Sequence, residues 1–361
     1  MNRQEAMKQI ERQFRGVIQR NRKLHNAYFL VHCEPLGIHL NIAEGKTRDQ
    51  SALPQQRYYI ASISKLFTSV LIAMLAEEGK LSYEDPIHRY LPPDLMHKLH
   101  IYKGTDYSNQ IQIKHLLSHT SGLHDYFEDR PKQGPRMLDL FTSEPSRQWT
   151  PQEVIQWSKE HLKSHFPPGQ GIRYSDTGYH LLGLLIESIT STPLHEAFRH
   201  YLFEPLQLHH THMAFYSMPA EEDPYPIADL YADQTVITDY KSISMEYAGG
   251  ALISTSDNLL TFMKALTGGK LISADSFQRM QVWTKFRPGV DYGYGIVRFR
   301  TVPLFLPAKY NVWGAWGYSG TFMFYHPALD AYLIGSLNQL RSTAKAVRIM
   351  FKAIDVLLRC K

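Results

Sequence analysis

Two residue pairs in the chain have the types and spacing of an activated serine. In the first, Ser62 and Lys65 lie three positions apart at the start of a strongly helical stretch. Residues at that spacing share one face of a helix, so the Lys65 amine can reach the Ser62 hydroxyl. A serine is a weak nucleophile until a neighbour accepts its proton, and a helix amino terminus favours developing negative charge. The second pair, Ser342 and Lys345, is better explained as a helix cap on a basic, solvent-facing surface.

Two further segments are candidates for the same site. Tyr174 and Asp176 follow a Pro-Pro-Gly loop and come directly before an apolar helical run. A tyrosine in that position often serves packing alone, but a phenol held near an ammonium has a lowered pKa and can carry protons. The segment 316–321, Trp-Gly-Tyr-Ser-Gly-Thr, falls in a predicted strand. Because glycines weaken a strand interior, they indicate either a β-bulge or an edge that a substrate backbone approaches.

The elements that must position these residues follow from hydrophobic periodicity. The pattern predicts an amphipathic helix over 3–21, a β-hairpin over 27–43 and a helix that ends at Gly79. Helix signals and Pro-rich breaks fill 85–245, strands return from residue 290, and an amphipathic helix closes the chain.

This order of elements indicates an α+β fold. The strands at the two ends of the chain predict a shared antiparallel sheet flanked by the terminal helices, and the middle of the chain predicts an inserted, mostly helical lobe. We therefore expect a sheet domain made of residues 1–85 and 246–361, and a helical domain of residues 86–245. The cleft between them is the expected place for an active site.

The composition is that of a soluble globular protein, with 43% hydrophobic and 20% charged residues in 361. Two cysteines exclude a disulfide-stapled scaffold and a four-cysteine zinc site. We expect Cys33 to be buried in a strand and Cys360 to be an exposed thiol. The amino terminus lacks the apolar core of a secretory signal, and no stretch is long enough to cross a bilayer, so the sequence predicts a cytoplasmic protein.

Positive charge is concentrated at the two ends of the chain. The net charge is +5 overall, +5 within residues 1–25 and +5 within residues 341–361, so the middle carries −5. Solvated helix faces explain this distribution, and the alternative is a basic patch that makes weak contact with an anionic surface. Nothing in the sequence has the aromatic and basic pattern of a nucleic-acid platform.

The order of the three candidate segments resembles that of penicillin-recognising serine hydrolases. Ser62-x-x-Lys65, then Tyr174-Ser175-Asp176, then a Gly-rich triad near the carboxyl end is the shared pattern. The chain is most similar to the class C β-lactamase-like group, which includes DD-peptidases, D-aminopeptidases and serine esterases. The likeness extends over about residues 25–340 and implies a β-lactamase/transpeptidase-like fold.

The resemblance implies a role for each matched residue. Ser62 would be the acylated nucleophile, Lys65 its proton acceptor or electrostatic partner, and Tyr174 a proton relay to the leaving group and from water. The backbone N–H groups of Ser62 and Thr321 would form the oxyanion hole. Asp176 would hydrogen-bond Lys65 and the substrate.

Two residues depart from the family pattern. Asp176 is charged where β-lactamases carry a neutral amide, and a carboxylate beside Lys65 favours the ammonium form, which shifts base work toward Tyr174. The triad is Tyr318-Ser319-Gly320, where the family has Lys or His first to bind a substrate carboxylate. A tyrosine carries no positive charge near neutral pH, so efficient β-lactam hydrolysis is not expected.

We therefore expect a serine hydrolase that forms an acyl-enzyme on Ser62 and hydrolyses small carboxylic esters or amides. The alternatives are a β-lactamase, a D-stereospecific peptidase or DD-carboxypeptidase, and a homologue that binds ligands but catalyses weakly. The resemblance implies no metal and no cofactor, and His209, His210 and His212 fit a loop better than a metal site. His119 is expected to hydrogen-bond within the helical lobe. Five aromatic residues are candidates for an apolar pocket or for core packing: Tyr292, Tyr294, Trp313, Trp316 and Tyr318.

Overall fold

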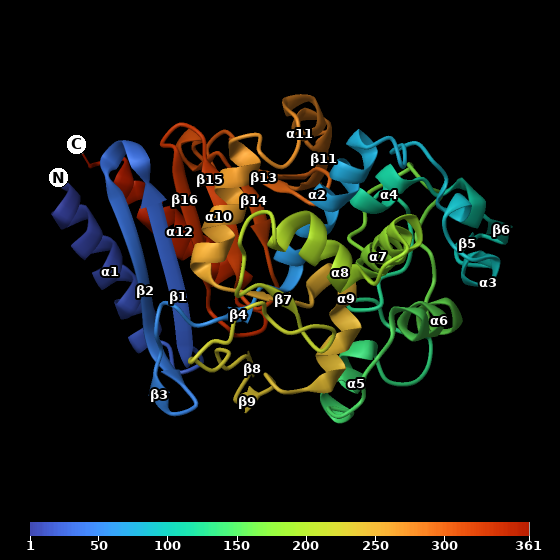
Figure 1. Ribbon diagram of the computed structural model, residues 1–361, viewed down its shortest axis with the longest axis horizontal. Coiled ribbons are helices and arrows are strands. Elements are labelled where there is room, and N and C mark those ends of the chain that lie inside the picture. Colours follow the sequence, from blue (N-terminus) through green and yellow to red (C-terminus); the bar gives the residue numbers. More distant parts are fainter. Residues whose placement is uncertain (361) are drawn as a thin grey trace.

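A large antiparallel sheet joins the two ends of the chain in the computed structural model, which describes residues 1–360 (Figure 1). The predicted shared sheet is thereby confirmed. Of the positively charged segment 341–361, the last residue lies outside the described residues. In spatial order the strands are β11 (Thr284–Arg287), β12 (Val290–Tyr292), β13 (Val297–Phe299), β14 (Val312–Trp316), β15 (Phe322–His326), β16 (Ala331–Ser336), β1 (Asn26–Cys33), β2 (Ile38–Thr47) and β3 (Gln50–Ser51).

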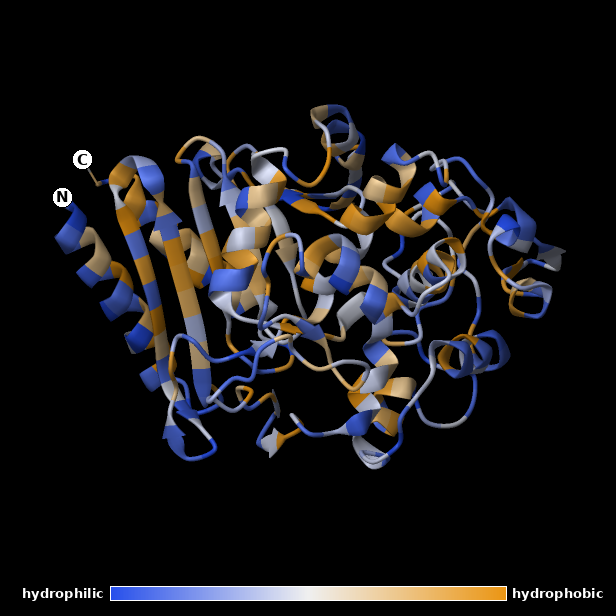
Figure 2. Cartoon of the chain, viewed as in Figure 1, coloured by the Kyte–Doolittle hydropathy of each residue, from blue (hydrophilic) through white to orange (hydrophobic). Residues whose placement is uncertain are grey.

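The middle of the sheet is made by strands from opposite ends of the sequence. β1 pairs with β16 and with β2, so that Leu30 lies between Ile334 and Asn41. The predicted hairpin is confirmed, with a 3-10 turn (Glu34–Leu36) that ends at Gly37 in the left-handed conformation. Figure 2 shows hydrophobic residues running along these central strands, which are covered on both faces.

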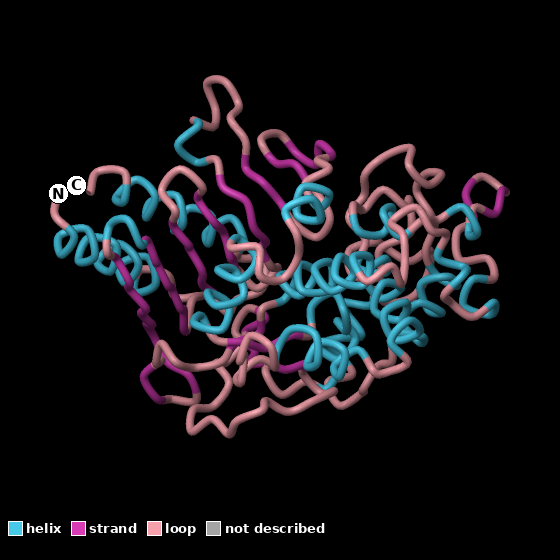
Figure 3. The backbone as a smooth tube through the Cα atoms, turned by 45° about the horizontal axis from the view of Figure 1, so that its top comes forward, coloured by secondary structure: helices cyan, strands magenta, loops and turns pink. Residues whose placement is uncertain are grey.

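Helices cover both faces of the sheet. On one face α1 (Arg3–Gln19) and α12 (Thr343–Leu357) pack against each other and against the strands, as predicted for the terminal helices. On the other face α10 (Ser256–Thr267) lies over β1 and β16. Figures 1 and 3 show this arrangement of a strand layer between helices.

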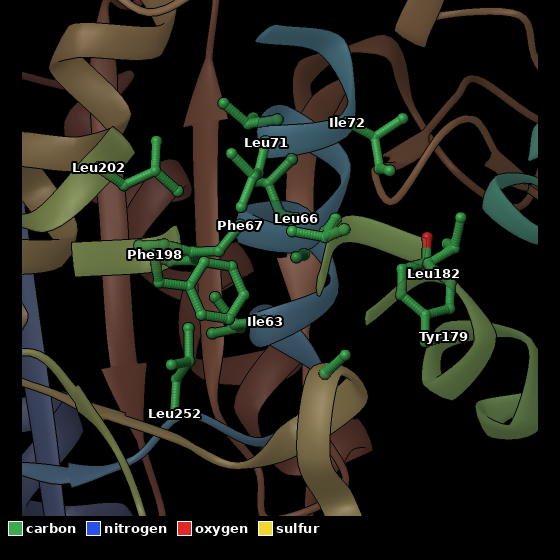
Figure 4. Packing of buried hydrophobic residues seen from close by; sticks show 14 of the residues in the cluster. Ile63, Leu66, Phe67, Leu71, Ile72, Tyr179, Leu182, Phe198, Leu202 and Leu252 are labelled. Atoms are coloured by element: carbon green, nitrogen blue, oxygen red, sulfur yellow. The ribbon is translucent and has the colours of Figure 1, made fainter. Parts of the chain in front are cut away.

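The helix α2 (Ser64–Glu77) forms the centre of the larger core. Eleven of its fourteen residues are buried. Figure 4 shows Phe67, Leu71 and Ile72 of this helix among side chains from several other elements, and the Phe67 ring stacks on Phe262 with centroids 3.8 Å apart. A helix buried on all sides has a fixed position, so it can hold a side chain at its amino terminus precisely.

The remaining elements lie mostly in the middle of the chain. No helix among residues 1–360 has both the length and the apolar character needed to cross a membrane. The proposed domain boundaries at 85 and 246 stay a prediction. The remaining helices are α3 (Pro93–Met96), α4 (Ile113–Leu117), α5 (Met137–Ser143), α6 (Pro151–His161), α7 (Asp176–Thr190), α8 (Leu194–Phe198), α9 (Tyr247–Gly250) and α11 (Ala274–Met280). The short strands are β4 (Tyr58–Tyr59), β10 (Leu252–Ser254) and β7 (His212–Met213) in one sheet, with the hairpins β5 (Ile101–Tyr102) with β6 (Thr105–Asp106) and β8 (Tyr231–Ala232) with β9 (Thr235–Val236).

Two local predictions are wrong. The glycine-rich segment is not a strand interior but the turn from β14 to β15, because the Gly317 N–H donates to the Thr321 carbonyl and Gly320 has a positive φ of 76°. Ser342 stands at the N-cap position of α12 but makes no side-chain capping bond, and at 4% exposure it is buried rather than solvent-facing. Cys33 is fully buried, as predicted, whereas Cys360 is only partly exposed.

Candidate active site

Ser62 lies in a 3-10 turn (Ala61–Ile63) that comes directly before α2. The turn is held on two sides. The Ile60 N–H donates to the Leu252 carbonyl of β10 over 2.9 Å, and the Ile60 carbonyl accepts a bond from Thr321 Oγ1 over 3.1 Å. The residue expected to complete the oxyanion hole is therefore bonded to the turn that carries the expected nucleophile.

Lys65 is oriented by three acceptors. Its Nζ lies 3.0 Å from Ser62 Oγ, 2.8 Å from the Gly249 carbonyl and 2.5 Å from Asp176 Oδ1. The side chain is 1% exposed, so water supplies none of its partners. Three acceptors match the three protons of an ammonium, and a buried ammonium needs a counter-charge. The geometry therefore fits a lysine that is charged at rest and paired with Asp176.

Tyr174 lies in the loop that comes before α7, and its side chain reaches Ser62 from there. Its hydroxyl donates to Ser62 Oγ over 3.0 Å. The ring lies 4.1 Å from the ring of His119, whose Nδ1 accepts the Ser175 N–H over 3.1 Å. This bond joins two residues of the segment 86–245, as predicted for His119. Burial and the nearby Lys65 charge lower the pKa of His119 well below its ordinary value.

The expected lowering of the tyrosine pKa is wrong. Burial, reinforced by the Asp176 charge, raises the pKa of Tyr174 well above its ordinary value. The loss of solvation outweighs the attraction of the Lys65 ammonium, which lies 5.1 Å from the ring centroid. Tyr174 is consequently a neutral hydrogen-bond donor at rest and not a phenolate base.

Asp176 begins α7, with Ser175 as its N-cap through a bond to the Gly178 N–H. The Asp176 N–H donates to Asp125 Oδ1 over 3.1 Å. Asp125 is 1% exposed, and its burial together with the Asp176 charge raises the pKa of Asp125 well above its ordinary value. Because two buried carboxylates this close do not both ionise readily, Asp125 is the one that stays neutral while Asp176 pairs with Lys65.

Glu246 is a second carboxyl that sequence reasoning missed. It lies on the cavity wall, one residue before α9, and its Oε2 packs so close to Gly250 that a side chain there would meet it at 2.4 Å. Burial and the neighbouring Asp176 charge raise the pKa of Glu246 to about 8, and Lys65 opposes this only in part. The only sequence signal is that this glutamate directly precedes a Tyr-Ala-Gly-Gly segment, and that signal alone does not indicate a site residue.

The predicted triad lies at the other end of the site. Ser319 is buried, and Gly320 fits only as glycine, since a Cβ would meet Leu337 and Ser342 at 3.0 Å. The Tyr318 hydroxyl accepts a 2.8 Å bond from Arg341 Nε. The sequence predicts no positive charge at the first residue of the triad. In the fold, Arg341, 23 residues further along the chain, places its guanidinium beside Tyr318.

These residues meet on the wall of one cavity of about 380 Å³. Ser62, Tyr174 and Asp176 line it, whereas Lys65 reaches Ser62 from below the surface. Of the five candidate aromatics, Tyr292, Trp316 and Tyr318 face the cavity, and Tyr294 and Trp313 pack with the core. Further lining residues are Tyr59, Phe127, Glu128, Leu138, Phe141, Leu230, Ile243, Glu246, Phe286, Arg287, Leu340, Arg341, Thr343 and Ala344.

Within residues 1–360, no group of three or more His, Cys, Asp or Glu side chains could hold a metal ion. His212 is in β7 and buried, and His209 lies near Glu221 on the surface.

The chain is similar in sequence to penicillin-binding proteins. The chain is 28% identical over 258 residues to penicillin-binding protein 4* of Bacillus subtilis (strain 168), covering 66% of this chain and 52% of that protein. The chain thus spans about half the length of the curated relatives it matches.

Solved structures share the whole fold. A D-stereospecific amidohydrolase from Streptomyces sp. superposes with a TM-score of 0.77 at 24% identity, over 95% of this chain and 97% of that one. EstCE1, a hydrolase with promiscuous acyltransferase activity, gives a TM-score of 0.74 at 19% identity, over 98% of each chain. The family model described as Beta-lactamase matches residues 6–355, and the chain belongs to this family.

Proposed function

We propose that the protein is a serine hydrolase that cleaves small carboxylic esters or amides through an acyl-enzyme on Ser62. One observation carries the proposal: Ser62 Oγ, at the cavity wall, receives hydrogen bonds from both Lys65 Nζ and Tyr174 Oη at 3.0 Å. A hydroxyl held between an amine and a phenol, beside a cavity for an acyl group, has the partners that nucleophilic catalysis requires.

Acylation begins with a proton rearrangement. At rest Lys65 and Tyr174 both donate hydrogen bonds to Ser62 Oγ. One of them must therefore lose a proton before it can accept the proton of the Ser62 hydroxyl. Asp176 Oδ1, 2.5 Å from Lys65 Nζ, takes a proton from the ammonium. The free amine then accepts the Ser62 proton while Oγ bonds to the acyl carbon and the carbonyl electrons move to its oxygen. The N–H groups of Ser62 and Thr321 hold this oxyanion.

Collapse of the tetrahedral intermediate breaks the bond to the leaving group. Tyr174 gives its proton to the departing oxygen or nitrogen and is reprotonated by Lys65. Water then enters, gives a proton to the Tyr174–Lys65 pair as it attacks the acyl carbon, and Ser62 takes that proton back as the acid leaves. Asp176 finally returns its proton to Lys65, which restores the ammonium and the carboxylate. The net reaction adds one water across one ester or amide bond, and every protein group returns to its starting state.

The cavity supports a small, partly apolar acyl group. About 380 Å³ accommodates a compact ligand, and the side chains of Phe127, Phe286 and Tyr292 give it aromatic walls. The predicted cytoplasmic location remains part of this proposal, since small metabolite esters and amides occur there.

A second candidate is a D-stereospecific amidase or peptidase. The similarity to the Streptomyces D-stereospecific amidohydrolase over 95% of this chain favours it. A β-lactamase is the weaker candidate, because Tyr318 replaces the usual cation, although Arg341 brings a positive charge to the same place.

Initial rates on three substrate types distinguish these candidates. We expect p-nitrophenyl esters to be hydrolysed faster than D-alanine p-nitroanilide and a chromogenic cephalosporin, and Ser62→Ala to lose at least about a thousandfold in kcat/KM. Preference for the D-alanyl anilide over its L-isomer and over esters would favour the second candidate. Equal rates for the wild type and Ser62→Ala on all three substrates would refute the hydrolase proposal.

A further inference from the structure

The loop between β13 and β14 exposes apolar side chains to solvent. Residues 302–308, Val-Pro-Leu-Phe-Leu-Pro-Ala, contain no polar side chain. Leu304 is 102% exposed and Phe305 is 85% exposed, which are the highest values among the large hydrophobic residues of the described chain. Neighbouring apolar residues this exposed at a loop tip indicate a surface that meets an apolar partner.

The loop is held in place at both of its ends. Val302 and Leu306 form a bridge, and both pack against the turn at Gly289, where a Cβ would meet them at 3.1 and 3.3 Å. After the loop, a 3-10 turn (Ala308–Tyr310) is fixed to α12. Lys309 Nζ lies 2.6 Å from Asp355 Oδ1, and the Tyr310 ring stacks on Phe351 at 4.3 Å. Leu304 and Phe305 therefore project from a rigid base.

The two elements next to this base, α12 and β11, carry positive side chains. Lys345, Arg348 and Lys352 recur at helical spacing on the outer face of α12, the helix to which the loop is fixed. On the other side of the loop, Lys285 and Arg287 belong to β11, whose turn supports Val302. Within residues 1–360 none of these five cations forms an ion pair, whereas Asp355 of α12 is paired with Lys309.

We propose that this face binds an anionic lipid bilayer, with Leu304 and Phe305 inserted among the lipids and the cations of α12 and β11 on the headgroups. A bilayer surface provides an apolar phase that can bury the exposed loop side chains, and negatively charged headgroups that can pair with the cations. Neither a short apolar loop nor a few cations gives stable attachment alone, and here both occur on one rigid surface.

The proposed docking face borders the catalytic cavity. Arg287 of β11, and Thr343 and Ala344 at the start of α12, also line that cavity. Docking would therefore bring the cavity mouth near the interface, where amphiphilic esters are concentrated. The docking proposal does not depend on hydrolysis and is tested without it.

Vesicle co-sedimentation of the full-length protein tests the proposal. The probes are phosphatidylcholine vesicles with and without phosphatidylserine, at low and high salt. We expect binding to the phosphatidylserine vesicles, weakened by salt through screening. Leu304→Ser with Phe305→Ser, and Arg348→Glu with Lys352→Glu, should each weaken binding about tenfold or more.

Two matched controls separate this face from general surface effects. Met218→Ser removes an equally exposed apolar residue (84% exposed) from another surface. Lys98→Glu with Lys103→Glu makes the same charge change near α3, β5 and β6, at the opposite end of the molecule (Figure 1). Both controls should bind as the wild type does, and thermal unfolding shows that each variant is folded.

Three outcomes would overturn the proposal. The wild type does not sediment with phosphatidylserine vesicles, or the two control variants lose as much binding as the loop and helix variants. The third is self-association of the wild type without vesicles that the Leu304 and Phe305 substitutions abolish, which would make a second copy the partner.

Discussion

The carboxyl of Glu246 should make the protein less stable as pH rises, and Glu246→Gln should remove that effect. In the folded protein the pKa of Glu246 is raised to about 8, from an ordinary value of 4.5. Below pH 4.5 the carboxyl is protonated in both the folded and unfolded states, so the free energy of unfolding does not depend on this group and is at its highest with respect to it. Between 4.5 and about 8 the folded state keeps a proton that the unfolded chain has released, and stability falls with pH.

The magnitude follows from the width of that interval. One bound proton costs about 1.4 kcal/mol per pH unit, so the full interval gives an upper limit of about 5 kcal/mol. Water in the cavity and the shared titration with Asp176 reduce the expected fall to about 2–4 kcal/mol. The amide of Glu246→Gln has the shape of the protonated acid and does not titrate. The variant should therefore match the wild type at pH 5 and exceed its stability at pH 8–9 by that amount.

Urea unfolding of both proteins at a series of pH values measures this difference. Subtracting the two curves removes the contributions of all groups that titrate independently of Glu246. Parallel curves, with the same stability gap at pH 5 and pH 9, would refute the assignment of a neutral carboxyl at this position.

Four further substitutions have defined outcomes. Tyr174→Phe removes the proton carrier, so kcat should fall about a hundredfold to ten-thousandfold while KM changes little; an unchanged steady-state kcat would contradict its role. Asp176→Asn removes the oxygen that accepts the Lys65 proton at the start of acylation, so kcat should fall about a hundredfold or more; an unchanged kcat would contradict this role of Asp176. Phe67→Ala opens a cavity under the site and should cost about 3–5 kcal/mol in urea unfolding, whereas Phe305→Ala, at an 85% exposed position, should cost less than about 0.5.

Local sequence patterns predicted those parts of the fold that local physics determines. The terminal helices, the hairpin at Gly37 and the helix after Ser62 each have a hydrophobic periodicity that fits only one type of secondary structure. The sequence pattern predicts a strand over the segment 316–321. The fold resolves it into a turn, since Gly317 and Gly320 supply a hairpin closure that periodicity cannot distinguish from a bulge.

The site was predictable only where residues are matched by a motif. The spacing of Ser62 and Lys65 places them together by helix geometry, and the family resemblance brings in Tyr174. Charge states were not predictable, because burial depends on the whole fold: it raises the pKa of Tyr174, which proximity to a lysine alone would lower. Glu246 and Arg341 also line the cavity, and the only local signal for either is the Tyr-Ala-Gly-Gly segment after Glu246, which does not indicate a site without the fold.

Covalent labelling gives the most direct test of the central claim, that the hydroxyl between Lys65 and Tyr174 is the nucleophile. The protein is treated with a fluorophosphonate, digested, and its peptides are analysed by mass spectrometry. The proposal predicts one stoichiometric adduct on Ser62, loss of esterase activity in proportion to labelling, and no adduct in Ser62→Ala. Labelling of another residue with retention of activity, or no labelling of Ser62 in an active enzyme, would contradict it.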